Sequence, residues 1–156
     1  MHDFKRRLPQ MITHYKSIIV AVDGSKEAEY AFRKSVEIAY RNQGSQLNIV
    51  NIIDTRHLGP FDKEFAEQLK EKSLQVLDRY KARAAAARVE NVKIIIEYGS
   101  PKTVITKEIA KSVKADLIIC GATGHTPVER YLMGSVSEAI VRSAKCNVLV
   151  VRTPAE

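Results

Sequence analysis

Five short apolar segments alternate with segments of helical periodicity, and this alternation constrains the fold more than any other feature of the chain. β-Branched and aliphatic residues dominate the apolar segments, so each is predicted to be a buried strand. The five segments are residues 17–22, 46–53, 92–98, 116–120 and 147–151. Strands that alternate with helices predict an α/β fold, a single doubly wound, Rossmann-like parallel sheet of five strands with helices on both faces.

Helix signals occupy the gaps between these strands. Ser25 fits the N-cap of a first helix that ends near residues 42–44, where a glycine can stop it. A long helix is expected over residues 62–88, and Ser100 followed by Pro101 predicts the start of another. The sequence therefore supplies a helix for each crossover between parallel strands.

Length and composition bound the class of protein. With 156 residues, 45% of them apolar, the chain predicts one globular domain, residues 17–156, behind an N-terminal extension, residues 1–16. No apolar run approaches the roughly 18 residues of a membrane span, and no secretory signal is evident, so a cytoplasmic protein without a membrane partner is expected. Cys120 and Cys146 fit no disulfide or zinc pattern and are expected to be core residues.

A net charge of +7 raises the question of nucleic-acid binding. Most of the basic residues are interspersed with acids, as on a solvated helix, and no aromatic base-stacking motif is present. No nucleic-acid partner is therefore expected. A basic surface also suits a small polyanionic ligand.

The stretch 116–137 combines a strand, a glycine-rich loop and the start of a helix. Gly121 and Gly124 follow the strand, and Gly134 stands directly before Ser135. Glycines let backbone N–H groups approach a ligand, and a helix N-terminus attracts anions, so a phosphate chain is a suitable ligand. Neither the P-loop pattern nor Gly-x-Gly-x-x-Gly occurs. The alternative is that the three glycines serve only a connecting loop and a helix start.

Residues 118–151 resemble the C-terminal signature of the universal stress protein family, and residues 18–25, IIVAVDGS, resemble its first strand and turn. The pattern Gly-x-x-Gly-x9-Gly-Ser is the mark of the ATP-binding branch of that family. The resemblance implies the strand order 3-2-1-4-5, which creates a switch point between the first and fourth strands. Ligands of such sheets bind in the crevice at the carboxyl ends of the strands beside that point.

The resemblance also implies a set of site residues for ATP with Mg²⁺ or Mn²⁺. The glycines and the N–H groups of Ser135, Val136 and Ser137 would hold the phosphates, and the two serine hydroxyls would donate to them. Asp23 would accept hydrogen bonds from base or ribose, and Ile52 would pack on the adenine. The complete predicted set is Ala21, Val22, Asp23, Ile52, Cys120, Gly121, Ala122, Gly124, Gly134, Ser135, Val136 and Ser137. Each side chain also has a structural alternative: Asp23 as a turn former, Ile52 as core, Ser135 as a helix cap.

No motif of a phosphotransferase or hydrolase identifies a catalytic residue. The sequence therefore predicts an ATP-binding universal stress protein, a regulator in the stress response with an unknown protein partner. A homodimer through the last strand, Asn147 to Val151, is expected, because an apolar edge strand without charge is an association hazard unless it is paired. The alternatives are a slow ATPase or phosphotransferase, and a dimeric scaffold that binds no ATP, with AMP or a cyclic nucleotide in its place.

Overall fold

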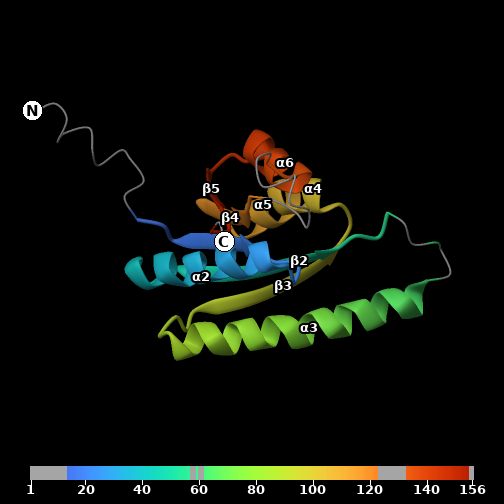
Figure 1. The fold of residues 1–156 in the computed structure, drawn as a ribbon, viewed down its shortest axis with the longest axis horizontal. Helices are drawn as coiled ribbons and strands as arrows, with labels where there is room; N and C mark the ends of the chain where they lie inside the picture. Colours follow the sequence, from blue (N-terminus) through green and yellow to red (C-terminus); the bar gives the residue numbers. More distant parts are fainter. Residues whose placement is uncertain (1–13, 57–58, 60–61, 123–132, 155–156) are drawn as a thin grey trace, which may run out of the picture.

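The computed structural model describes residues 14–56, 59, 62–122 and 133–154. Its centre is one sheet of five parallel strands in the order β3-β2-β1-β4-β5 (Figure 1), which confirms the predicted fold and strand order. The strands are β1 (Ser17–Ala21), β2 (Gln46–Ile53), β3 (Val92–Tyr98), β4 (Leu117–Gly121) and β5 (Asn147–Val151). In the described part of the chain, no helix is long and apolar enough to cross a membrane.

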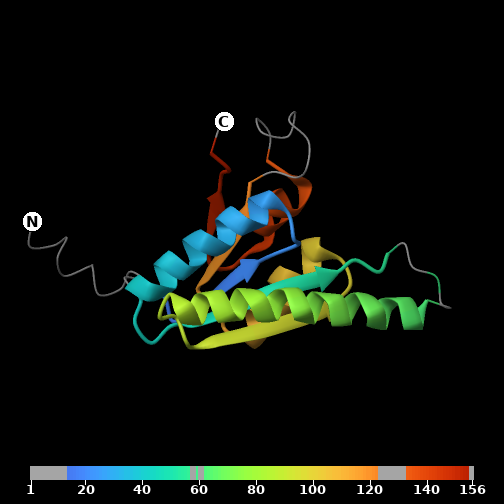
Figure 2. The same ribbon diagram turned by 60° about the horizontal axis from the view of Figure 1, so that its bottom comes forward.

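Helices α2 (Lys26–Arg41) and α3 (Lys63–Ala86) cover one face of the sheet. Figure 2 shows them side by side in front of the strands. Phe32 of α2 packs on Tyr80 of α3 with ring centroids 4.5 Å apart, and both rings belong to the same core cluster as Ile18 and Ile49. The apolar stripe predicted for the first helix is therefore its buried face.

The opposite face carries a helix that runs without interruption through α4 (Pro101–Val104), η2 (Ile105–Ile109) and α5 (Ala110–Ser112), followed by α6 (Ser135–Ser143). The middle segment is π-helical, and the Ala110 N–H donates to the carbonyl of Ile105, five residues earlier. Ile105 and Ile140 pack there against Ile19 and Ile118 of the sheet. Two apolar layers, one on each face, thus bury the strands.

The predicted strand boundaries hold to within one residue. The strands over 46–53, 92–98 and 147–151 match, whereas β1 ends at Ala21 and β4 runs from Leu117 to Gly121. Asp116 directly precedes β4, and its carboxylate accepts the N–H groups of Lys16 and Ser17, at 2.8 and 3.1 Å. Lys16, predicted to belong to the extension, is therefore bonded to the domain.

Candidate functional site

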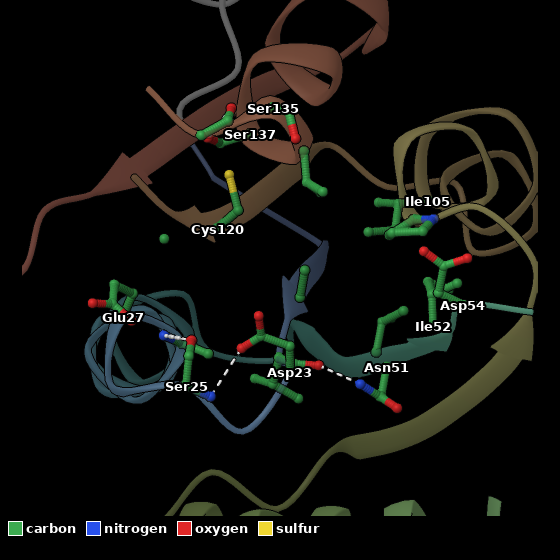
Figure 3. A pocket seen from close by; sticks show the side chains of 18 residues that line it. Asp23, Ser25, Glu27, Asn51, Ile52, Asp54, Ile105, Cys120, Ser135 and Ser137 are labelled. Atoms are coloured by element: carbon green, nitrogen blue, oxygen red, sulfur yellow. Dashed lines mark hydrogen bonds between the residues drawn. The ribbon is translucent and has the colours of Figure 1, made fainter. Parts of the chain in front are cut away.

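A cavity of about 360 Å³ lies at the carboxyl ends of β1, β2 and β4 (Figure 3). β1 and β4 are neighbours in the sheet, and the next helices, α2 and α6, lie on opposite faces, so the cavity occupies the switch point of the fold. Its walls are formed by Ala21, Val22, Asp23, Ser25, Glu27, Ala28, Val50, Asn51, Ile52, Asp54, Pro101, Ile105, Cys120, Gly121, Gly134, Ser135, Val136 and Ser137. Ten of the twelve predicted site residues are in this set.

The N-termini of three helices border the cavity. Glu27 lies in the first turn of α2, Pro101 is the first residue of α4, and Ser135 is the first residue of α6. The first N–H groups of a helix lack intrahelical acceptors, and the dipole places partial positive charge there. These helix starts consequently favour negative charge beside them, whereas the wall also carries the three carboxylates of Asp23, Glu27 and Asp54.

The start of α6 is fixed to the end of β4 by backbone bonds. Gly134 is the N-cap, and its N–H donates to the Ala122 carbonyl at 2.8 Å. The buried Ser137 hydroxyl lies 3.2 Å from the Ala122 carbonyl and 3.0 Å from the Gly134 carbonyl. The single proton of that hydroxyl is directed at these carbonyls, so Ser137 holds the loop, which differs from its predicted role as a phosphate donor. Ser135 is exposed and places its hydroxyl at the cavity wall.

Ala122 and Gly124 are the two predicted site residues outside the cavity wall. Ala122 is 2% exposed, and its N–H donates to the Val151 carbonyl at 2.9 Å. It therefore joins β4 to β5, and its predicted place beside the ligand stays a prediction. Gly124 lies outside the described residues, as do His125 and Arg130 of the same connection.

Asp23 has the turn-forming role that the sequence left open. Its Oδ1 accepts the Ser25 N–H at 2.9 Å, and Gly24 follows with a φ of +84°. Ser25 Oγ in turn accepts the Ala28 N–H at 3.1 Å and caps α2, as predicted. Asp23 is nevertheless exposed at the cavity wall, so its carboxylate can accept further hydrogen bonds from a ligand.

The end of the cavity away from Ser135 is lined mainly by apolar side chains, with Ile52 of β2 near Ile105 (Figure 3). The Cys120 side chain of β4 lies nearer to Ser135 and Ser137. Burial raises the pKa of the Cys120 thiol to about 11, so the thiol stays protonated and behaves as a small apolar group. Asp54 stands at the rim, and its Oδ2 lies 2.6 Å from Arg56, which raises the pKa of that guanidinium.

Comparison with known proteins identifies the family. The model of the universal stress protein family matches residues 14–152. The chain belongs to the universal stress protein family. One curated universal stress protein relative, from Staphylococcus saprophyticus, is 51% identical over 142 residues, covering 89% of this chain and 84% of its own.

Solved universal stress protein structures share the fold. UspA from Lactobacillus plantarum has a TM-score of 0.79 at 30% identity, covering 90% of this chain and 99% of its own. A universal stress protein determined in complex with cAMP has a TM-score of 0.67 at 26% identity, covering 91% of this chain and 100% of its own.

Eight wall residues of this universal stress protein were not predicted: Ser25, Glu27, Ala28, Val50, Asn51, Asp54, Pro101 and Ile105. Asn51 and Asp54 carry a usable signal, since polar residues at the carboxyl end of a strand next to a switch point are expected to face the crevice. Pro101 and Ile105 carry none, because they reach the cavity only through the packing of their helix over β2.

Proposed function

We propose that this universal stress protein binds an adenine nucleotide, with ATP as the preferred ligand, and acts as a nucleotide-dependent regulator. The observation that carries the proposal is the continuity of the cavity, which joins the N-terminus of α6 at Ser135 to an apolar slot between Ile52 and Ile105. Its volume of about 360 Å³ lies within the range of small-molecule sites, roughly 300–1,000 Å³. The similar universal stress protein in complex with cAMP supports an adenine nucleotide as the class of ligand.

The phosphates would lie at the start of α6. The N–H groups of Ser135, Val136 and Ser137 belong to the first turn of that helix, and the Ser135 hydroxyl is exposed beside them. The described residues contain no cluster of three or more His, Cys, Asp or Glu that could hold a metal ion. A Mg²⁺ or Mn²⁺ ion would therefore be held mainly by phosphate and water oxygens, with the Asp23 and Glu27 carboxylates near enough to the cavity to accept hydrogen bonds from that water.

The base would lie in the apolar slot, with Ile52 against its face. The backbone of Ile52 also has a suitable direction. The carbonyl of Ile53 accepts the Gly99 N–H at 3.0 Å on the β3 side, so by strand alternation the polar groups of Ile52 point to the other side, where β1 has ended. One donor and one acceptor thus face the slot, which matches the amino group and ring nitrogen on the edge of adenine.

Regulation by occupancy is proposed in place of catalysis, because the wall residues that the structure describes include no nucleophile hydrogen-bonded to a base. Binding energy would stabilise one state of the protein and so change the surface presented to a partner. A homodimer through β5 is part of the proposal. β5 is an edge strand of the sheet, and its sequence Asn147–Val151 carries no charged residue.

The test is calorimetric titration of ATP with Mg²⁺ into the full-length protein stripped of nucleotide. Micromolar or tighter binding is expected for the wild type, and its loss in Gly134→Val, because a branched side chain would stand at the N-cap beside the phosphates. Gly59→Val is the matched control, since Gly59 is remote from the cavity wall and an added Cβ meets nothing closer than 3.7 Å. Absence of heat with ATP, ADP, AMP and cAMP in the wild type would refute the proposed function.

A further inference from the structure

A short chain of polar groups links α3 to the end of β1 beneath the cavity. The Ser73 hydroxyl donates to Asn51 Oδ1 at 2.8 Å, and Asn51 Nδ2 donates to the Val22 carbonyl at 2.7 Å. Figure 3 shows the second bond beside the Asp23 turn. Both bonds are partly buried, so water competes with them weakly.

The bond to Val22 stands where the β1–β2 ladder would otherwise continue. The last bond between the two strands runs from the Val22 N–H to the Val50 carbonyl at 2.8 Å. In a parallel pair, the next bond would join the Ile52 N–H to the Val22 carbonyl. Within the described residues no such backbone bond is formed, and the Asn51 amide occupies that carbonyl.

The side-chain amide therefore lets the chain leave the sheet at Val22 without an unsatisfied carbonyl. Val22 is 4% exposed, and a carbonyl buried there needs a partner. Because Asn51 supplies that partner, the Ile52 N–H is left outside the ladder and points toward the cavity. The Val22 carbonyl can only accept, so Nδ2 must face it, and the Ser73 hydroxyl donates to the Oδ1 that is left on the side of α3.

We propose that Asn51, held by a second hydrogen bond from Ser73, is a positioning residue that ends the β1–β2 ladder at Val22 and keeps the Ile52 backbone available to read the edge of a purine base. The inference rests on the proposed nucleotide site and adds a source of base selectivity to it. Asn51 acts through Val22 and Ile52, so its removal should alter the choice between bases more than the binding of phosphates.

The first experiment measures the ligand-free state. Amide hydrogen exchange by NMR on the full-length protein should show the Ile52 N–H exchanging much faster than that of Val50, which lies within the ladder. Addition of ATP should slow the exchange of Ile52 at least tenfold. An Ile52 amide that is as protected as Val50 without ligand would overturn the proposal.

The second experiment compares the dissociation constants of ATP and of 1-deaza-ATP, in which a C–H group replaces the ring nitrogen that would accept the Ile52 N–H. The wild type should prefer ATP by about tenfold, as expected for one hydrogen bond. Asn51→Asp keeps the shape but loses the donor, and it should reduce this ratio to near one while the affinity for the analogue changes less than threefold. Ser73→Ala, which removes the second hydrogen bond of the amide and so weakens its hold, should give an intermediate ratio and serves as the milder variant should Asn51→Asp fold poorly.

The control is Asn147→Asp, the same change at an exposed asparagine on β5 whose amide donates to the Tyr15 hydroxyl. It should leave the ratio at its wild-type value. If the wild type binds ATP and Asn51→Asp and Ser73→Ala both retain the full preference, the positioning role is wrong and the nucleotide site stands. If the wild type binds neither triphosphate, the nucleotide site and the positioning role both fail.

Discussion

A β-carbon on Gly121 would lie 3.1 Å from the Cβ of Glu27 and 3.2 Å from its backbone carbonyl carbon and oxygen. The first turn of α2 therefore packs directly on the end of β4, and this contact holds the N-termini of α2 and α6 on the same cavity. Gly121 therefore has a packing role that the phosphate motif alone does not indicate, and its role beside the phosphates stays a prediction.

Gly121→Ala is expected to destabilise the protein by about 1–3 kcal/mol, the usual effect of overpacking. Two of the three close atoms belong to the backbone of Glu27, so relief requires a shift of α2 and not a rotamer change. Urea unfolding of the full-length protein measures the loss. Gly59→Ala is the control, because its added Cβ meets only Asp62 Oδ2 at 3.7 Å, and equal stability of the two variants would contradict the contact.

The fold was predictable because each of its elements has a local signal. The alternating apolar segments define the strands, and the ends of β2, β3 and β5 agree with the sequence to the residue. The π-helical turn at Ile105–Ile109 was not predictable, since its sequence has ordinary helical periodicity. The early end of β1 was also missed, because it depends on a bond from Asn51, a residue of another strand.

The candidate site was predictable where a residue follows a strand or starts a helix, as Asp23 and Ser135 do. The roles of the hydroxyl groups were not predictable. The Ser137 proton is directed at the Ala122 carbonyl, which lies 3.2 Å from the hydroxyl oxygen only in the folded protein. The position of Glu27 in the cavity wall was also not predictable. Its place beside Gly121 results from the packing of α2 on β4, and no motif in either segment indicates it.

Cys120 should make the free energy of unfolding depend on pH above 9. Burial raises the folded-state pKa of its thiol to about 11, so the folded protein retains the proton at a pH where the unfolded chain, with an ordinary thiol pKa, has lost it. Its contribution is therefore fully present below pH 9 and is lost as the pH rises toward 11, at roughly 1.4 kcal/mol per pH unit. The free energy of unfolding, measured between pH 8 and 10.5, should fall more steeply with pH in the wild type than in Cys120→Ala. Parallel curves would show that the thiol titrates normally.

Arg83 of α3 forms an ion pair with α2 and cation–π contacts with two aromatic rings. Its Nη1 lies 2.7 Å from Glu29 Oε1, and its guanidinium stacks 4.9 Å from the Phe32 centroid and 5.4 Å from that of Tyr80. Arg83→Met should cost about 1 kcal/mol, since the pair is partly exposed but the cation also contacts both rings. Arg41→Met, which removes a more exposed pair with Glu37, should cost less than about 0.5 kcal/mol. A double-mutant cycle with Glu29→Gln measures the coupling, and additive effects would argue against it.

Val150→Pro is expected to convert the proposed homodimer to a monomer. The Val151 carbonyl accepts the Ala122 N–H at 2.9 Å, so Val151 faces β4 and, by alternation, the N–H of Val150 points outward from the sheet edge. Proline removes that donor and leaves the ladder with β4 intact.

The control is Ile96→Pro, which places a proline at an outward position of β3, the opposite edge of the sheet, and should leave the dimer unchanged. Sedimentation equilibrium at micromolar protein measures the state, with circular dichroism to confirm folding. A wild type that sediments as a monomer, or a folded Val150→Pro dimer, would remove β5 as the interface.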